Sequence, residues 1–312
     1  MSSASAQPHP HLASGLLLAS AGSIAFSGKA IIVKLAYRHG VDAVTLIMYR
    51  MLFALPLFLA LAWWATYRQG GGGKPPLTRK DWLGILGLGV TGYYLASFLD
   101  FWGLQYISAS LERLILYLNP TLVLILGWVL YQRRITPLQG LAMAVSYAGV
   151  LLVFGHEADF AGPGAALGAL LVFGSAISYA IYLVYSGELV KRLGSMRLVG
   201  LATSVACLLC LLQFVLLRPL DAATAVAPEV VWLSVLNATL CTFAPVIMVM
   251  MAIERIGAGL AAQTGMIGPM STIAMGVLLL DEPFNGWIVA GTVLVVSGVF
   301  LVTRFGSAGA SK

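Results

Sequence analysis

Two carboxylates and an arginine lie inside apolar stretches of this 312-residue chain, at Asp100, Glu112 and Arg113. Ionisable groups in such surroundings are costly and are functional candidates by default. The short connection at 105–108 predicts that the stretches on either side of it are antiparallel neighbours, which would bring Asp100 close to Glu112. A carboxylate kept from water holds its proton at a higher pH, so these two groups are candidates for proton uptake outside a cell and release inside it. A static ion pair that shares Arg113 is the alternative.

Two more cations extend this predicted charge network. Lys29 lies deep in the first apolar stretch, where its side chain suits either a substrate carboxylate or the role of counter-ion to Asp100. Arg50 lies in the second stretch. We expect it to contact an anion or a carboxylate of the protein, or to fix helix packing as part of a structural charge pair.

Aromatic and amide side chains are the candidate contacts for a substrate. Tyr94, Tyr117 and Tyr182 lie within apolar stretches, and Asn119 and Gln263 add amide groups. Aromatic faces line pockets for amphipathic organic solutes, and tyrosine hydroxyls bond the polar end of such a solute. These residues are therefore predicted to form a substrate-binding cavity.

Prolines mark two of the same stretches. Pro120 follows Asn119 directly, and a proline inside a helix kinks it and leaves the carbonyl one turn back unpaired. We expect that carbonyl to bind substrate together with Asn119 and Gln263. Pro120 and Pro269 are predicted hinges.

The composition indicates a lipid environment. Hydrophobic residues make up 60% of the chain and charged residues only 10%, whereas soluble domains carry about 25% charged residues. Basic residues are scattered in pairs, which argues against nucleic acid as a partner. A helix needs about 20 apolar residues to cross a bilayer. An all-α membrane protein with ten transmembrane helices is predicted, at residues 12–36, 43–67, 82–105, 107–131, 137–155, 163–188, 197–217, 229–253, 256–280 and 285–304.

Lys and Arg in the connections predict the orientation, because cytoplasmic connections are rich in them. With both termini in the cytoplasm, the outside connections contain only Arg38 and Arg218. The inside connections and the C-terminal end then contain Arg68, Lys74, Arg79, Lys80, Arg133, Arg134, Lys191, Arg192, Arg197, Arg255, Arg304 and Lys312. We therefore expect a multi-pass protein of the inner or plasma membrane with its N- and C-termini cytoplasmic.

An internal repeat relates distant parts of the chain. A shift of 149 residues places Ile107-Ser-Ala-Ser-Leu111 over Ile256-Gly-Ala-Gly-Leu260, and Pro120 over Pro269. Matching Pro and Gly at one fixed offset are harder to attribute to chance than matching Leu or Val.

The repeat unit contains five helices, an odd number, so its second copy is expected to cross the membrane in the opposite sense. We predict a first five-helix repeat at 12–155 and a second, inverted repeat at 163–304, with disordered ends at 1–11 and 305–312. Inverted repeats are typical of transporters that bind substrate near the midplane, where the two halves meet.

Two stretches, Ser108–Pro120 and Gly257–Pro269, share a small-residue start and a central proline, and Leu279-Leu-Asp-Glu-Pro283 forms an acidic turn. In these features and in the five-plus-five arrangement, the chain resembles the EamA-type permeases of the drug/metabolite transporter superfamily over about residues 14–304. The acidic turn resembles the family's "GE" turn, with Asp281 where glycine is usual. The resemblance implies export of small metabolites without naming one.

These features predict a secondary transporter, and not an enzyme, that exports a small organic metabolite by alternating access. The substrate would be an amino acid or an amphipathic compound, and protons acting on Asp100 and Glu112 would supply the coupling. The expected partners are the substrate, the lipid bilayer and protons, without cofactor, metal or nucleic acid, in a monomer or homodimer. An intramembrane enzyme, an uptake carrier and a nucleotide-sugar-type exchanger are the alternatives.

Overall fold

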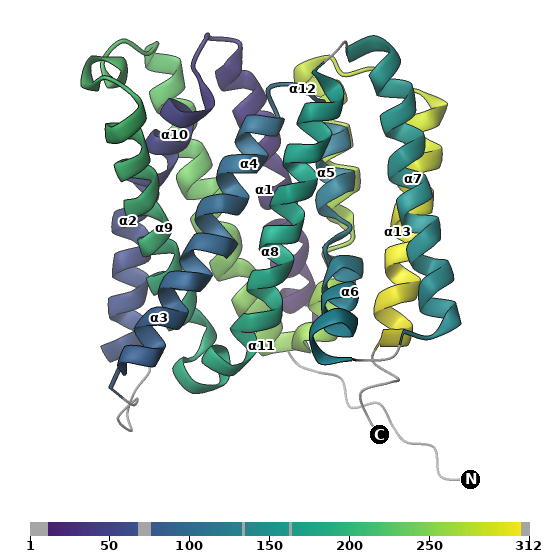
Figure 1. The fold of residues 1–312 in the computed structure, drawn as a ribbon, viewed down its shortest axis with the longest axis horizontal. Helices are drawn as coiled ribbons and strands as arrows, with labels where there is room; N and C mark the ends of the chain where they lie inside the picture. Colours follow the sequence, from purple (N-terminus) through teal and green to yellow (C-terminus); the bar gives the residue numbers. More distant parts are fainter. Residues whose placement is uncertain (1–11, 68–75, 133–134, 162–163, 307–312) are drawn as a thin grey trace.

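The computed structural model describes residues 12–67, 76–132, 135–161 and 164–306, and every regular element in that part of the chain is a helix (Figure 1). The expected disorder of residues 1–11 and 307–312 lies outside the described residues. At the C-terminal end the final helix continues to Gly306, so the disorder expected from residue 305 begins too early by two residues.

The helical runs follow the apolar stretches of the sequence. In chain order they are α1 (Leu12–Tyr37), α2 (Ala43–Tyr67), α3 (Arg79–Leu88) continued by η1 (Gly89–Leu95) and α4 (Ala96–Gly103), α5 (Ala109–Leu116), α6 (Asn119–Tyr131), α7 (Pro137–Ala161), α8 (Ala165–Leu193), α9 (Ser195–Leu217), the short η2 (Leu220–Ala223), α10 (Pro228–Ala238) continued by η3 (Thr239–Phe243) and α11 (Ala244–Thr264), α12 (Ile267–Leu280) and α13 (Gly286–Gly306).

Nine helical runs among the described residues are long and apolar enough to cross a membrane. The stretch 256–280, expected to be one continuous span, is divided. α11 ends at Thr264, and the shorter apolar helix α12 follows at Ile267–Leu280. Earlier in α11, close to the boundary expected between the spans 229–253 and 256–280, Gly257 has φ 79° and ψ 158°. Glycine adopts this positive φ without a steric penalty, so the chain changes direction at the lower end of the bundle in Figure 1, the end at which α1 begins.

The outward faces of the helices are apolar. Leu17 on α1, Leu216 on α9 and Leu278 on α12 expose 71%, 72% and 78% of their surface. Water-soluble proteins rarely leave extensive apolar surface uncovered, whereas the hydrocarbon of a bilayer solvates it. The length, hydropathy and exposed faces of these helices define a multi-pass membrane protein.

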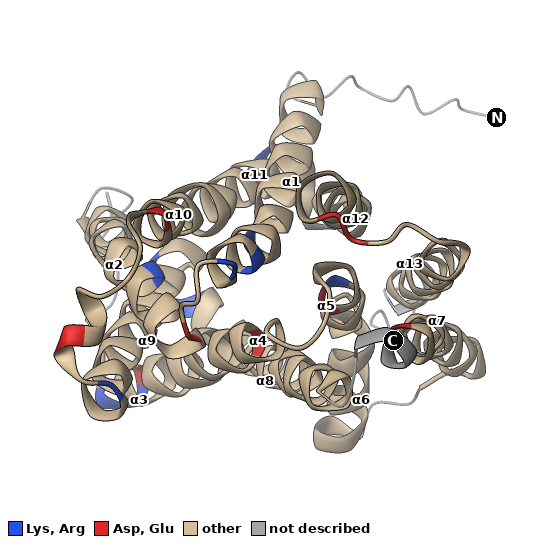
Figure 2. Ribbon diagram, turned by 90° about the horizontal axis from the view of Figure 1, so that it is seen from above, with Lys and Arg blue, Asp and Glu red and all other residues tan. Residues whose placement is uncertain are grey.

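Helices from the first half of the chain pack against helices from the second. α1 contacts α11, α2 contacts α9, α4 contacts α8, and α7 contacts α13. Figure 2 shows α7 and α13 paired at one edge of the bundle and α2, α9 and α10 at the other. The space between the halves is therefore walled by helices far apart in sequence.

Irregular backbone recurs at corresponding places in the two halves. The π-helical segment η1 interrupts the run from α3 to α4, and η3 interrupts the run from α10 to α11. A break separates α5 from α6, and another separates α11 from α12. Gln132 ends α6 with φ 54°, and Asp281 ends α12 with φ 58°. Each of these three irregularities thus occurs once in each half.

Candidate substrate-binding cavity

A cavity of about 440 Å³ lies between the two halves of the chain. Its volume falls in the range of roughly 300–1,000 Å³ that is usual for small-molecule sites. Many of the residues predicted from the sequence to bind substrate or carry charge are on its wall: Lys29, Arg50, Asp100, Arg113, Tyr117, Asn119 and Tyr182.

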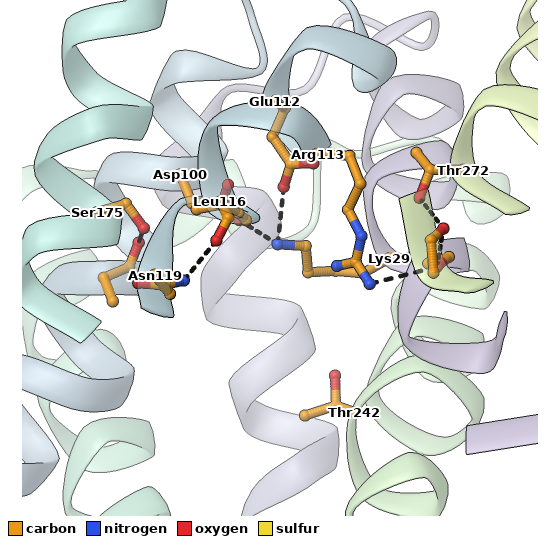
Figure 3. Close-up of polar contacts among 12 residues, drawn as sticks. Lys29, Asp100, Glu112, Arg113, Leu116, Asn119, Ser175, Thr242 and Thr272 are labelled. Atoms are coloured by element: carbon orange, nitrogen blue, oxygen red, sulfur yellow. Dashed lines mark hydrogen bonds and ion pairs between the residues drawn. The ribbon is translucent and has the colours of Figure 1, made fainter. Parts of the chain in front are cut away.

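A buried charge cluster, formed by Lys29, Asp100 and Glu112, lies at this cavity (Figure 3). The Nζ of Lys29 donates to Oδ2 of Asp100 at 2.5 Å and to Oε1 of Glu112 at 3.0 Å. Asp100 is 3% exposed and Glu112 is fully buried. The short connection between α4 and α5 brings the two carboxylates together, as expected, but the cation between them is Lys29 and not Arg113.

Arg113 turns instead toward α1 and α12. Its Nη2 lies 3.4 Å from Oγ of Ser27, and that hydroxyl donates to the carbonyl of Gly268 at 2.8 Å. A Cβ at Gly268 would lie 2.6 Å from Nη2 of Arg113. The missing side chain therefore makes room for the guanidinium beside the start of α12.

Arg50 is held on one side only. Its Nε donates to Oγ1 of Thr242 at 3.1 Å, and its guanidinium carbon lies 5.0 Å from the centre of the Phe101 ring. Thr242, in η3, donates in turn to the carbonyl of Asn237, five residues back near the end of α10, a carbonyl that the wider π-helical turn makes accessible. Within the described part of the chain, the buried Nη1 of Arg50 has no hydrogen-bond partner.

A tyrosine cluster, formed by Tyr93, Tyr179 and Tyr182, lines another part of the cavity. The hydroxyls of Tyr93 and Tyr182 are 3.2 Å apart, and the rings of Tyr179 and Tyr182 stack with centroids 5.4 Å apart. Tyr93 takes the place expected for Tyr94, which packs against the apolar core and is not on the cavity wall. The π-helical segment η1 shifts the phase of the helix here, and apolar periodicity does not reveal such a shift.

Gly92 sets the position of Tyr182. A Cβ at Gly92 would lie 2.5 Å from two ring atoms of Tyr182, which is closer than packing permits. The tyrosine ring can lie against η1 only because residue 92 has no side chain.

Asn119 occupies the carbonyl that Pro120 frees. Its Nδ2 donates to the carbonyl of Leu116 at 2.7 Å, so that carbonyl is not left open for substrate as the sequence suggested. Among the described residues, the buried Oδ1 of Asn119 has no hydrogen-bond partner. Gln263 is exposed and is not on the cavity wall.

The two predicted hinge prolines stand just after the helix breaks. Pro120 is the second residue of α6, and Pro269 is the third residue of α12. Both positions suit proline, because the first turn of a helix has no partner for its backbone N–H groups.

The cavity extends from the charge cluster toward the lower end of the bundle. α1 rises from that end (Figure 1), and Lys29 lies past its middle. α8 and the run Pro228–Gly257 lead downward, and the cavity residues Ser186 and Met250 lie in the second halves of these two runs. The charges therefore form the upper part of the cavity.

Above the charges, two carboxylates bind the N-terminus of α5. Glu157 accepts from the backbone N–H and hydroxyl of Ser108 at 2.6 and 2.7 Å. Glu282 accepts from the N–H of Ala109 at 2.6 Å and from the hydroxyl of Ser110 at 2.6 Å. Anions are favoured at this positive end of a helix. Neither glutamate was predicted to have this role, although the acidic turn and the serines at 108 and 110 were the available signals in the sequence.

A further contact joins the halves at the upper end, where Arg218 after α9 donates to Asp42 before α2 at 3.1 Å. Partial burial raises the pKa of the Asp42 carboxyl, but hydrogen bonds from Thr45 and Arg218 outweigh it and hold that pKa below its ordinary value.

The fold and this central cavity define a membrane transporter, and comparison with known proteins gives its family. The EamA-like transporter family matches the chain twice, at residues 13–155 and 166–304. The chain belongs to the EamA-like transporter family, and the resemblance found in the sequence is confirmed.

Relatives of this chain are also described as transporters. The uncharacterized transporter YcbK of Bacillus subtilis (strain 168) is 31% identical over 280 residues, which cover 86% of each chain. An uncharacterized transporter of Archaeoglobus fulgidus is 22% identical over 288 residues, or 92% of this chain and 96% of its own. A chain of known crystal structure superposes with a TM-score of 0.63 at 18% identity, over 95% of this chain and 98% of that one, which shows a shared fold.

Proposed function

We propose that the protein is a secondary transporter, rather than an enzyme, that exports a small organic solute by alternating access. The observation that carries the proposal is the 440 Å³ cavity with buried charges at the junction of the two halves of the chain. Lys29 and Asp100 come from the first half, and Tyr182 and Thr242 come from the second. A movement of one half against the other would therefore rebuild the site, as alternating access requires.

The proposal includes two inverted repeats, at 12–155 and 163–304. The paired π-helical segments, helix breaks and left-handed caps support it, since each occurs once in each half. Helix contacts support it too. The first span, α1, packs on the eighth, which contains α11, and the sixth, α8, packs on the third, which contains α4. In the proposed repeats, the first span corresponds to the sixth and the third to the eighth. A pseudo-two-fold axis that exchanges the halves would therefore make these two contacts equivalent.

Charge supports a cytoplasmic lower end and hence the direction of export. Lys80, Lys191 and Arg192 lie on helix ends there, whereas the upper connections include Asp42 and Asp281. Basic connections are favoured on the cytoplasmic side. A cavity that extends toward the cytoplasmic end would receive its solute from the cell interior.

Proton coupling would act through Asp100 and Glu112. Among the described residues, the other charged groups that face this pair are Lys29, Arg50 and Arg113. A proton arriving from outside would neutralise one carboxylate and weaken its hold on Lys29, which joins α1 to α4 and α5. Loss of that proton to the cytoplasm would restore the ion pair and reset the transporter.

The test is a substrate-panel efflux assay from loaded proteoliposomes, with and without a pH gradient. We expect saturable efflux that is accelerated by solute on the far side, which separates a carrier from a channel or an enzyme. Asp100→Asn and Glu112→Gln should each abolish the effect of the pH gradient, whereas Asp221→Asn, at an exposed position of η2, should not. If both cavity variants keep full pH-dependent flux, coupling through these carboxylates is wrong.

A further inference from the structure

We infer that the cavity binds an organic anion, with an acid group such as a carboxylate on an aromatic body, and that Arg50 receives the negative charge. This inference names the substrate class of the proposed transporter. Movement of this anion across the membrane rests on the transport proposal, whereas its binding in the cavity does not.

Charge balance is the first observation. Among the described residues of the cavity and its charge cluster, three cationic side chains, Lys29, Arg50 and Arg113, face two carboxylates, Asp100 and Glu112. With all five ionised, one positive charge has no counter-charge. An unbalanced charge is expensive in a buried site, so a ligand that supplies a negative charge is favoured there.

Arg50 is the cation that we assign to the ligand. The buried Nε of Arg113 also has no partner among the described residues, but Arg113 directly follows Glu112 in the chain and its Nη2 is directed at Ser27. Arg50 is only 6% exposed, its Nε is taken by Thr242, and one face of the guanidinium lies against Phe101. Its Nη1 is without a hydrogen-bond partner in the described part of the chain, and the residue is on the cavity wall. A guanidinium with a free edge matches the two oxygens of a carboxylate and binds them more strongly than it binds a neutral acceptor.

Cationic and zwitterionic ligands fit this site less well. Lys29 bonds Oδ2 of Asp100 at 2.5 Å and Oε1 of Glu112 at 3.0 Å, and the second oxygen of each carboxylate has no partner among the described residues. An ammonium group that used one of these oxygens would add a fourth positive charge beside two carboxylates, and a zwitterion would leave the excess positive charge uncancelled. An anion reaches Arg50 without breaking either ion pair.

The tyrosine cluster indicates the rest of the ligand. Tyr93, Tyr179 and Tyr182 present ring faces, edges and hydroxyls along the cavity, and Phe58 adds a further ring. Aromatic side chains favour stacked or edge-to-face contact with another ring. A bare inorganic anion would leave this surface unused, whereas an aromatic acid would contact both it and Arg50.

The binding test uses the purified full-length protein in detergent and four matched probes: phenylacetate, 2-phenylethylamine, 2-phenylethanol and acetate. Isothermal titration should give affinity for phenylacetate at least about tenfold higher than for the other three, since the charge-assisted contact and the ring contact are each worth about that factor. Equal or tighter binding of the amine or the alcohol would overturn the anion assignment. Equal binding of acetate would overturn the aromatic part.

Variants then test Arg50 itself. Arg50→Gln should weaken phenylacetate binding at least about tenfold, and Arg50→Lys should recover part of it, because lysine keeps the charge but not the planar fork. Arg38→Gln is the control, since Arg38 is exposed at the upper end of the bundle. Wild-type affinity in both Arg50 variants would overturn the assignment. If Arg50→Gln does not fold, the ranking of probes on the wild type still decides the anion class.

Flux measurements separate this inference from the transport proposal. If proteoliposomes carry 2-phenylethylamine in saturable exchange and do not carry phenylacetate, the anion inference fails while transport stands. If phenylacetate binds through Arg50 but neither it nor the other probes show saturable flux, transport fails while the binding site stands.

Discussion

At the scale of single residues, the buried charge cluster depends on Lys29. Replacement by Gln would leave Asp100 and Glu112 buried without the cation that bonds both of them. Removal of one partner from a buried ion pair typically costs about 3–5 kcal/mol. We expect Lys29→Gln to lower the free energy of unfolding by about 3 kcal/mol, measured by denaturation in mixed micelles.

A double variant tests whether the unpaired carboxylates cause this loss of stability. Adding Asp100→Asn to Lys29→Gln removes one of the uncompensated carboxylates, so the double variant should be more stable than the single one. Lys191→Gln, at an exposed position near the end of α8, should stay within about 0.5 kcal/mol of the wild type. A single variant as stable as this control would show that the ion pairs contribute nothing.

Gly92 and Gly87 form a matched pair in the same helical run. A Cβ at Gly92 would meet Tyr182 at 2.5 Å, whereas nothing lies within 4 Å of a Cβ at Gly87. Gly92→Ala should therefore cost about 1–3 kcal/mol of stability through overpacking and reduce transport by displacing the Tyr182 ring. Gly87→Ala should be neutral or slightly stabilising, because Ala favours helix over Gly. Equal stability and equal flux in the two variants would contradict this role of Gly92.

Residue type and membrane depth were enough to predict many of the residues on the cavity wall. Charged and amide groups are rare in lipid, so Lys29, Arg50 and Asn119 stand out in the sequence. Side-chain direction was harder to predict. Tyr93 and not Tyr94 lines the cavity because η1 changes the helical phase. Gln263 is exposed because its helix follows the turn at Gly257.

At the scale of elements, α5 depends on its N-terminal carboxylates. Glu282 accepts from the N–H groups of Ala109 and Ser110 and from the Ser110 hydroxyl. Loss of a helix N-terminal acceptor costs about 1 kcal/mol, and loss of the charge adds up to about 1 kcal/mol. Glu282→Ala should lower the free energy of unfolding by about 1–2 kcal/mol, again in mixed micelles.

The neighbouring residue provides the control. Asp281 has a side chain that is 92% exposed and lies 4.0 Å from its nearest cation, Arg38. Asp281→Asn should change stability by less than about 0.5 kcal/mol. If Glu282→Ala is no more destabilising than this neighbour, the glutamate does not stabilise α5.

Helix positions were predictable because each span needs a run of apolar residues, and that run is visible in the sequence. Their interruptions were not. The π-helical segments have tertiary partners: Ser178 donates to the carbonyl of Thr91 in η1, and Arg50 donates to the hydroxyl of Thr242 in η3. The turn at Gly257 is the exception, because it lies close to the boundary expected between the spans 229–253 and 256–280.

At the scale of the whole molecule, the orientation across the membrane is a direct test. The native cysteines are buried, so a new exposed cysteine should dominate labelling. Asp221→Cys, near the upper end, should react with a membrane-impermeant maleimide in intact cells. Lys191→Cys, near the lower end, should react only after permeabilisation. The opposite pattern would reverse the orientation and with it the proposed direction of export.

The proposed division into two repeats rests, in the sequence, on residues such as Pro120 and Pro269 that recur at one offset. After a duplication, proline and glycine are replaced less readily than other residues, because backbone geometry restricts their replacement. The polar groups of the cavity show no such recurrence. At the same offset Asn119 stands over Gly268, so the proposed repeats would enclose an asymmetric site.

The two left-handed helix caps offer a route to a sturdier protein for laboratory use. Gln132 and Asp281 adopt positive φ angles without being glycine, and both are exposed. Glycine pays no steric penalty in this conformation, whereas most residues lose roughly 1 kcal/mol. Gln132→Gly should raise the melting temperature in detergent, and Asp281→Gly should raise it less, because aspartate tolerates the conformation better than glutamine. Neither change touches the cavity, so purification and crystallisation should become easier while substrate recognition is retained.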